Sequence, residues 1–275
     1  MARLTNGHVY AQKLLSDLGF DDIIDIPIDL FASGLYEITG FDVIVIEEPL
    51  ANCDGKIIFG KNKVIIKVNS EIQFEARKRF VIAHEIGHLI MHKHLQIADD
   101  STCNFEIFQG MEKVLKNGIQ EIEANEFASE LLMPKKVFIT ETQKTKKFSP
   151  LVIKKLADKF KTSITATTFK YIDSNLHPIC VFFIENGKVK YWKKSADMRV
   201  KVRDYIHLAP PKDSVAMEYL DGNYEYLYSF ESKPQEISKS TWFELSEFDN
   251  EDSDFYEFCI PTKEFKTILS IIWED

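Results

Sequence analysis

The sequence predicts an α+β fold, because an apolar helical segment, several β-branched segments and a later group of hairpin signals follow one another along the 275-residue chain. Residues 80–91 place apolar side chains on nearly all sides of a helix, which is typical of a helix buried in a core. Residues 41–46 and 63–69 are rich in valine and isoleucine, as strands are. We expect a first domain over residues 1–175 and a small α+β module over residues 176–275.

The segment before the buried helix is predicted to form two helices and then strands. Residues 9–18 have helical apolar spacing, and a second helix is expected to begin within residues 26–30. After the strand at 41–46, residues 56–59 and 63–69 have the composition of two further strands. Glycine, lysine and asparagine separate these two strands, which is a turn composition and predicts a hairpin.

Two histidines in the buried helix are spaced to bind one metal ion. His84 and His88 lie four residues apart, so their imidazoles project from the same face of a helix. Glu85 is placed to reach a water on such an ion, which is the general-base position in a zinc peptidase. The alternative is a pair of core histidines satisfied by hydrogen bonds. Gly87 costs about 1 kcal/mol relative to alanine inside a helix, so it indicates close approach of another backbone.

A third ligand is expected from a second helix, because catalytic zinc usually takes three protein ligands and leaves a fourth position for water. The helix is predicted within residues 121–134, where an apolar stripe is formed by Ala124, Phe127, Ala128, Leu131 and Leu132. Glu121 falls on the stripe side, where its carboxylate would be costly unless it met a cation. Asn125 lies one turn further on and could bond the outer nitrogen of a ligand histidine. Glu123 and Glu126 are interpreted as solvated helix charges.

The other histidines and the cysteines are not expected to be ligands. His92 continues the spacing of His84 and His88, but a fourth ligand would close the position that catalysis needs. We interpret His92 as a partner near the site or a cation at the helix end, and His94 as a surface residue. The four cysteines lack metal or disulfide spacing and are expected to be reduced and mostly buried; they are Cys53, Cys103, Cys180 and Cys259.

Residues 77–88 and 121–134, in that order, resemble the two motif blocks of the ImmA/IrrE family of metallopeptidases. The resemblance covers about residues 1–175 and implies a zincin-like fold with a bound zinc ion. Carried over position by position, the implied zinc ligands are His84, His88 and Glu121, and the implied catalytic residue is Glu85.

The resemblance also implies a function. Members of the family cut helix-turn-helix repressors of phage, mobile-element or stress-response genes, so we expect a zinc-dependent endopeptidase acting on one regulatory protein. The alternative is a non-catalytic regulator that uses the zinc fold as a scaffold and binds DNA or a repressor. An intact Glu85 favours the enzyme, because a scaffold needs no general base.

Residues 149–172 read as a helix pair that resembles a helix-turn-helix. Ser149 and Ser163 are placed as helix caps, and Pro150 is suited to a first helical position. The pair lies in a basic block, residues 135–170, with ten lysines and two acidic residues. The pair could read DNA, but the net charge of −9 argues against non-specific nucleic-acid binding, and we expect a structural pair.

The substrate is expected to add as a strand to a sheet edge beside the active-site helix, as it does in zincins. The candidate edge is the segment 64–69, with Val64, Ile66 and Val68 as candidate substrate-binding residues. On this hypothesis the substrate must be extended or locally unfolded where it is cut.

The C-terminal module is predicted to be rich in strands. Residues 179–184 and 188–192 flank Glu185-Asn186-Gly187, a clear hairpin signal. Further strands are expected at 224–230, 240–245 and 255–261, with a last helix or strand near 265–273. The module is acidic, and we consider three roles for it, as a sensor, a substrate-docking surface or a cover for the peptidase core.

The sequence gives no sign of a membrane protein. It has no N-terminal apolar run and no stretch long enough to cross a bilayer, so we expect a cytoplasmic protein whose partner is a protein substrate. No glycine-rich phosphate loop or nucleophile elbow is present, which argues against other common enzyme chemistries.

Overall fold

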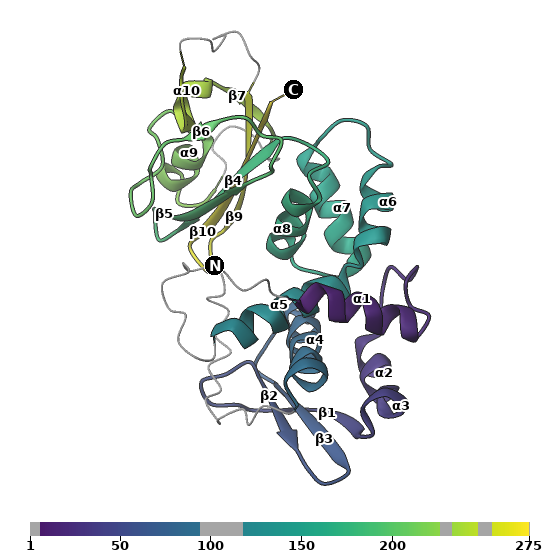
Figure 1. Ribbon diagram of the computed structural model, residues 1–275. Coiled ribbons are helices and arrows are strands. Elements are labelled where there is room, and N and C mark those ends of the chain that lie inside the picture. Colours follow the sequence, from purple (N-terminus) through teal and green to yellow (C-terminus); the bar gives the residue numbers. More distant parts are fainter. Residues whose placement is uncertain (1–5, 94–117, 226–232, 247–254, 275) are drawn as a thin grey trace. The chain divides into compact units, whose positions relative to one another are not determined.

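The protein has a mixed α+β fold whose elements are shown in Figure 1. The computed structural model describes residues 6–93, 118–225, 233–246 and 255–274. The chain divides into two compact units, the first formed by Met1–Glu141 and Lys155–Thr167, the second by Thr142–Lys154 and Thr168–Asp275. The predicted division at residue 175 stays a prediction, since the compact units share the helix pair between them.

Three helices open the first unit, and the first two confirm the expected ones. They are α1 (Gly7–Asp17), α2 (Ile28–Ser33) and α3 (Tyr36–Thr39). Helix α1 buries Ala11, Leu14 and Leu15, whose spacing places them on one face. That face contributes to a core built around the sheet and the two longest helices.

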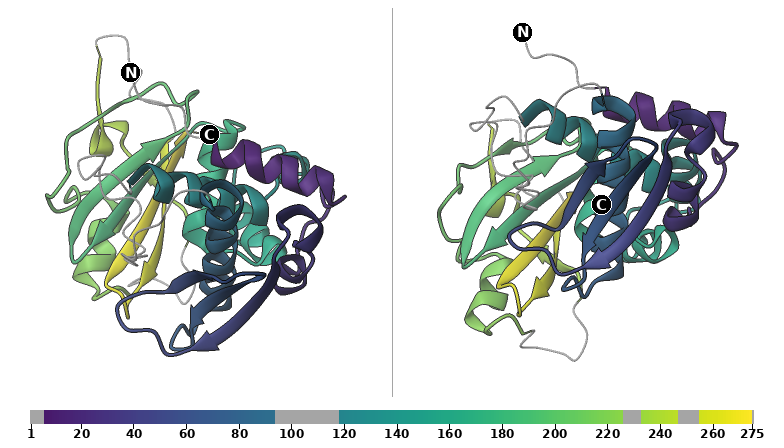
Figure 2. Two further views of the ribbon diagram at one scale, coloured as in Figure 1. Left: turned by 60° about the horizontal axis from the view of Figure 1, so that its bottom comes forward. Right: turned by 90° about the horizontal axis from the view of Figure 1, so that it is seen from below.

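Three strands form the sheet of the first unit. They are β1 (Asp42–Glu48), β2 (Gly55–Phe59) and β3 (Lys63–Asn69), in the order β1-β3-β2. Strands β2 and β3 pair antiparallel, with Ile57 opposite Ile66, so the predicted hairpin is confirmed. Strand β1 pairs with β3 in parallel. The sheet lies against one side of helix α4 (Glu75–His92), as Figure 2 shows.

The prediction that residues 64–69 form a free edge is wrong. Strand β3 has β1 on one side and β2 on the other, so its backbone N–H and C=O groups pair with both neighbouring strands. Val64, Ile66 and Val68 are fully buried in the core and cannot contact a substrate. Among the described residues, the edges of this sheet are β1 and β2.

The second long helix of the first unit is α5 (Gly118–Leu132), which packs against α4 and α1. The predicted apolar stripe is confirmed, because Ala124, Phe127, Ala128, Leu131 and Leu132 are all buried. The face of α5 that carries this stripe packs against α4. The buried position of α4 is confirmed as well, with eleven of its residues buried.

Three shorter helices follow: α6 (Lys135–Thr142), α7 (Pro150–Phe160) and α8 (Ile164–Ser174). Helices α7 and α8 confirm the expected helix pair. In α8, Phe169 lies beside Tyr191, with ring centroids 5.9 Å apart, and the ammonium of Lys193 lies over the same ring. Part of α8 is therefore committed to packing within the second unit.

An antiparallel sheet of five strands, in the order β5-β4-β10-β9-β7, dominates the second unit. The strands are β4 (Ile179–Glu185), β5 (Lys188–Lys194), β7 (Gln235–Ile237), β9 (Phe255–Thr262) and β10 (Thr267–Glu274). Asn186 and Gly187 both have positive φ, 49° and 74°, which forms the predicted tight hairpin turn. The strand expected at 255–261 is confirmed, and the last element is a strand rather than a helix.

Smaller elements complete the second unit. Helix α9 (Val215–Asp221) and the short α10 (Lys239–Trp242) accompany a two-stranded pair, β6 (Lys201–Val202) and β8 (Phe243–Glu244). The strand expected at 240–245 is wrong in its first half, because α10 buries Trp242 by stacking it on Phe182, with centroids 4.0 Å apart. Most of the strand expected at 224–230 lies outside the described residues. Within the described ranges, no helix is long and apolar enough to cross a membrane.

Candidate metal centre

Three predicted ligand residues meet where α4 and α5 pack together. His84 Nε2 and His88 Nε2 are 3.0 Å apart, because one helical turn separates them on the same face of α4. Glu121 of α5 reaches both, with Oε2 at 3.3 Å from His84 Nε2 and Oε1 at 3.3 Å from His88 Nε2. The three ligand atoms lie within 4.8 Å of one another. The geometry could therefore hold one metal ion.

Gly87 allows this close approach of the two helices. A Cβ at position 87 would lie 3.2 Å from Ala124 Cα and 3.1 Å from Phe127 Cδ1, closer than ordinary contact. The glycine between the two histidines thus lets the backbone of α5 come close to α4, as its helix-breaking cost suggests. This approach carries Glu121, one turn before Ala124, within reach of the histidines.

The charges of the cluster suit metal binding. Burial would raise the pKa of Glu121, but the adjacent imidazoles of His84 and His88 lower that pKa by more, to well below its ordinary range. Burial also lowers the pKa of His88, and this effect outweighs the neighbouring Glu121 carboxylate, which raises that pKa. A carboxylate and a neutral imidazole are the forms that ligate a metal.

Two imidazole nitrogens and one carboxylate oxygen fit a divalent ion such as zinc. The side chain of Glu121 is 40% exposed, so one side of the cluster stays open to solvent. An open side is what a catalytic rather than a structural metal site requires. Within the described part of the chain, this is the one group of three or more potential ligands.

Each ligand histidine has a partner at its outer nitrogen. His84 Nδ1 lies 2.8 Å from Asn125 Oδ1, where the sequence placed that partner. His88 Nδ1 lies 3.0 Å from His92 Nδ1, and His92 Nε2 lies 3.2 Å from Glu123 Oε2. His92 is buried, so of its two interpretations the structure supports a partner near the site.

The interpretation of Glu123 as a solvated charge is wrong. Its side chain is 22% exposed and pairs with His92 of the neighbouring helix. The partner comes from α4, so the apolar stripe of α5 does not reveal it. The side chain of Glu126 is one third exposed, and its Oε2 lies 3.7 Å from His8 Nδ1. His94 and Cys103 lie outside the described residues, and Cys53, Cys180 and Cys259 are buried as expected.

Glu85, the candidate general base, is buried and lies against strand β2. A Cβ built on Gly55, the first residue of β2, would stand 3.0 Å from Glu85 Oε1 and 2.3 Å from Val81 Cγ1. Only a glycine leaves room there for both side chains. Strand β2 therefore begins beside the candidate catalytic carboxylate.

Comparison with known proteins agrees with this geometry. Residues 39–170 match the family model of the IrrE N-terminal-like domain, Peptidase_M78, and that segment contains α4, α5 and all three candidate ligands. Residues 39–170 are therefore similar to an IrrE N-terminal-like domain. The matching segment begins just before β1 and ends within α8.

Two known proteins resemble parts or all of the chain. Metallopeptidase ImmA of Bacillus subtilis (strain 168) is 31% identical over 108 residues, which are 38% of this chain and 57% of that protein. The chain therefore matches little more than half the length of this relative. A solved Mycobacterium tuberculosis transcriptional regulator has a similar fold, with a TM-score of 0.59 at 10% identity, over 98% of this chain and 77% of that one.

A small network of side chains fixes the start of β2, and sequence reasoning missed it. Arg77 of α4 binds Asp54, the residue before β2, with Nη2 and Nε at 2.6 and 2.8 Å from Oδ2. The side chain of Asn69 donates to the carbonyls of Leu50 and Cys53, both at 3.1 Å. The network fixes the position of the loop before β2, and so the position of Gly55 relative to α4.

Replacing Gly55 with alanine is expected to lower the free energy of unfolding by about 1–3 kcal/mol, because overpacking forces Val81, Glu85 or β2 to move. Urea denaturation would measure the loss. The matched control is Gly34→Ala, since a Cβ at position 34 would lie 3.5 Å or more from its neighbours. A change equal to that of the control would mean that β2 does not approach α4 this closely.

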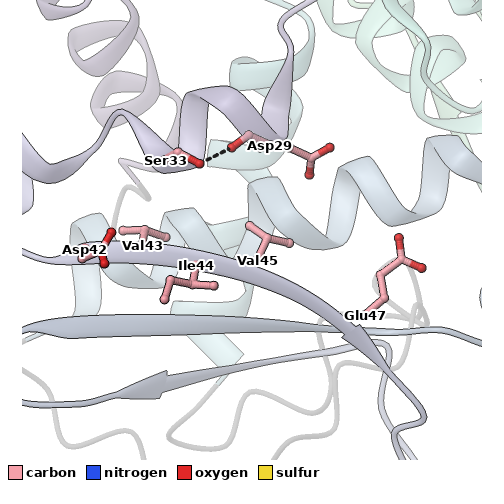
Figure 3. Close-up of a pocket in the computed structure, with 7 residues that line it drawn as sticks. All are labelled: Asp29, Ser33, Asp42, Val43, Ile44, Val45 and Glu47. Carbon is pink, nitrogen blue, oxygen red and sulfur yellow. Dashed lines mark hydrogen bonds between the residues drawn. The ribbon is translucent and has the colours of Figure 1, made fainter.

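A hollow in the first compact unit lies apart from the candidate metal ligands. It has a volume of about 470 Å³ and lies between α2 and the outer edge of β1 (Figure 3). Its lining residues are Asp29, Ser33, Asp42, Val43, Ile44, Val45 and Glu47. Ser33 Oγ donates to the carbonyl of Asp29 across one turn of α2, at 3.0 Å. None of the lining residues belongs to the cluster of candidate ligands.

Proposed function

We propose that this protein is a zinc-dependent endopeptidase that cleaves one regulatory protein, a helix-turn-helix repressor of a phage, mobile-element or stress-response system. One observation carries the proposal. His84, His88 and Glu121 converge within a Peptidase_M78 domain, and Glu85 follows the first ligand directly. The similarity to metallopeptidase ImmA supports the same reaction. Two histidines and one glutamate are a known ligand set of catalytic zinc, which is why we propose zinc as the metal.

The mechanism follows from the positions of the side chains. A divalent ion held by His84, His88 and Glu121 would lower the pKa of a water and polarise the carbonyl of the substrate. Glu85 takes the proton of the attacking water and later delivers it to the leaving amine. Asn125 accepts the Nδ1 proton of His84 and so keeps the Nε2 lone pair of that histidine free for the ion.

We propose that the substrate adds as a strand to the outer edge of β2, in a zincin-like arrangement. Among the described residues, β2 is paired on one side by β3 and has no strand on the other. Its first residue, Gly55, lies beside Glu85. A peptide bound along this edge would pass the candidate base, so β2 replaces β3 as the candidate substrate strand. The segment to be cut must be extended, as in a loop or a frayed helix.

The alternative, a non-catalytic scaffold that binds DNA or a repressor through α7 and α8, has less support. The packing of Phe169 on Tyr191 favours a structural role for α8 over a role in reading DNA. The roles considered for residues 176–275, as a sensor, a substrate-docking surface or a cover for the peptidase core, stay predictions.

The test is to mix the purified protein with the helix-turn-helix repressor encoded beside its gene and to follow the products by intact mass spectrometry. We expect two fragments with zinc, and a rate lower by about a hundredfold or more after a chelator has removed the metal. Adding zinc back should restore cleavage. Binding without zinc-dependent fragments would favour the scaffold, and a cut in the middle of a rigid strand would contradict substrate addition to β2.

A further inference from the structure

The two candidate ligand histidines are held by partners of different chemistry. The outer nitrogen of His84 meets the amide oxygen of Asn125, whereas that of His88 meets a third imidazole, His92. An amide oxygen can only accept a hydrogen bond. An imidazole nitrogen can donate or accept, so His92 alone does not determine which nitrogen of His88 carries the proton.

Glu123 removes this ambiguity. It lies 3.2 Å from His92 Nε2, and a carboxylate accepts hydrogen bonds but donates none. His92 Nε2 must then carry a proton and donate it to Glu123. In a neutral His92 the other nitrogen, Nδ1, is an acceptor, and at 3.0 Å it faces His88 Nδ1. His88 Nδ1 donates to it, which leaves the Nε2 lone pair of His88 facing His84 and Glu121.

We propose that Glu123, acting through His92, is a positioning residue that fixes His88 in its metal-binding tautomer. This inference rests on the proposed metal site and adds two residues to it. Hydrogen bonds link His88 to His92 and His92 to Glu123. The direction of both follows from the Glu123 carboxylate, which can only accept.

The opposite arrangement of protons shows why the hydrogen bonds from His88 through His92 to Glu123 matter. Without Glu123, His92 can place its proton on Nδ1 and donate to His88 Nδ1. The proton of His88 then lies on Nε2, where Glu121 Oε1 at 3.3 Å accepts it. In this arrangement a ligand carboxylate is bonded to a ligand histidine, and both must be released before a metal can bind. Loss of Glu123 should therefore weaken metal binding even though Glu123 is not a ligand.

Zinc affinity is the measurement, made on the purified full-length chain by competition with a chromophoric chelator. We expect Glu123→Ala to weaken zinc binding by about 10- to 100-fold. Glu126→Ala is the matched control, because Glu126 lies on the same helix beside His8. Its affinity should stay within about twofold of wild type. Circular dichroism of the metal-free proteins verifies that each variant is folded.

A double-mutant cycle distinguishes action through His92 from the plain effect of a negative charge near the metal. His92→Leu should weaken zinc binding about as much as Glu123→Ala, and combining the two should add little further loss. In contrast, if Glu123 acts by its charge alone, its removal should cost the same affinity with His92 present or absent. That additive result would overturn the proposal.

Rescue provides a second test. Aspartate at position 92 can place an acceptor-only oxygen where His92 Nδ1 now lies, so it should fix the His88 tautomer without Glu123. The double variant His92→Asp with Glu123→Ala should bind zinc at least tenfold more tightly than His92→Leu with Glu123→Ala. Nitrogen-15 spectra of the zinc-loaded wild type should show His92 protonated at Nε2 and not at Nδ1. Protonation of His92 at Nδ1 would contradict the proposed direction of these hydrogen bonds.

The outcomes separate this inference from the proposed function. If wild type binds zinc and Glu123→Ala binds it equally well, the positioning role fails while the peptidase proposal stands. If wild type binds no zinc, both fail. If Glu123→Ala loses affinity but zinc-loaded wild type cuts no repressor, the positioning role stands and the peptidase proposal fails.

Discussion

Replacement of Glu85 with glutamine is expected to abolish cleavage of the substrate while zinc affinity stays within about threefold of wild type. Glutamine has nearly the same shape but no basic oxygen, so the attacking water keeps its proton. A positioned general base contributes about 10²- to 10⁴-fold to the rate. Glu85 does not belong to the group formed by His84, His88 and Glu121, so the metal ligands remain in place. Fragment formation at saturating zinc measures the rate, and chelator competition measures the affinity.

The informative comparison is with Glu121→Gln, which alters a candidate ligand. This variant should lose zinc affinity and cleavage together, whereas Glu85→Gln should lose cleavage alone. Glu85 is buried against Gly55, and glutamine fills the same space, so the fold should tolerate the change. Cleavage by Glu85→Gln at the wild-type rate would show that another group takes the proton.

The second large effect is expected from Glu257→Gln, in the second unit. Glu257 of β9 is fully buried, and both its carboxylate oxygens accept hydrogen bonds. The donors are Val215 N and Trp242 Nε1 to Oε2, and Ala216 N, Ser270 Oγ and Cys259 Sγ to Oε1. The carboxylate thus joins the start of α9, the indole of α10 and strand β10.

Glutamine cannot reproduce this arrangement, because its amide nitrogen accepts no hydrogen bond. Whichever way the amide is turned, its NH₂ group faces a backbone N–H, from Val215 on one side or Ala216 on the other. The backbone N–H is then left without an acceptor and lies against the amide NH₂ group, which is also a donor. The free energy of unfolding should therefore fall by about 3 kcal/mol or more.

Urea denaturation followed by tryptophan fluorescence measures this loss, since Trp242 contacts Glu257 directly. Glu236→Gln is the control, because Glu236 is exposed on β7 and its replacement should change stability by less than about 0.5 kcal/mol. Zinc affinity should be unchanged in both variants, as the candidate ligands belong to the other compact unit. Equal stability of the two variants would mean that Glu257 does not tie these elements together.

The parts of the candidate site that could be predicted are those fixed by helical periodicity. His84 and His88 share a face because of their spacing, and Glu121 and Asn125 follow from the apolar stripe of α5. These relations are local, so they need no knowledge of how the chain folds back on itself. Gly87 added a nonlocal hint, since its cost made sense only if another backbone came close.

The order of the strands could not be predicted in the same way. The hairpin signal pairs β2 with β3 but does not say on which side β1 joins them. Strand β1 pairs with β3 in parallel, across a connection that contains β2, and this choice made β3 central. Pairing between segments distant in sequence depends on the whole core, which a local pattern does not contain.

Two carboxylates were misjudged or missed because their partners come from other elements. The face of α5 that carries Glu123 predicts a solvated charge, yet His92 of α4 lies beside Glu123. Glu257 was included in an expected strand without a role of its own. Its alternation with Phe255 and Cys259, both buried, was a signal that it points into a core.

The outer edge of β2 has a consequence for how a peptidase of the proposed kind would select its target. A strand edge offers N–H and C=O groups that are the same in every protein, so it discriminates weakly between amino-acid sequences. Selection would then depend on how often a candidate segment detaches from its own fold. Each 1.4 kcal/mol of local opening free energy corresponds to about a tenfold difference in the cleavable population. The choice of target would thus be governed by the conformational stability of the repressor, and an agent that loosens one loop of the repressor could trigger its destruction without touching the peptidase.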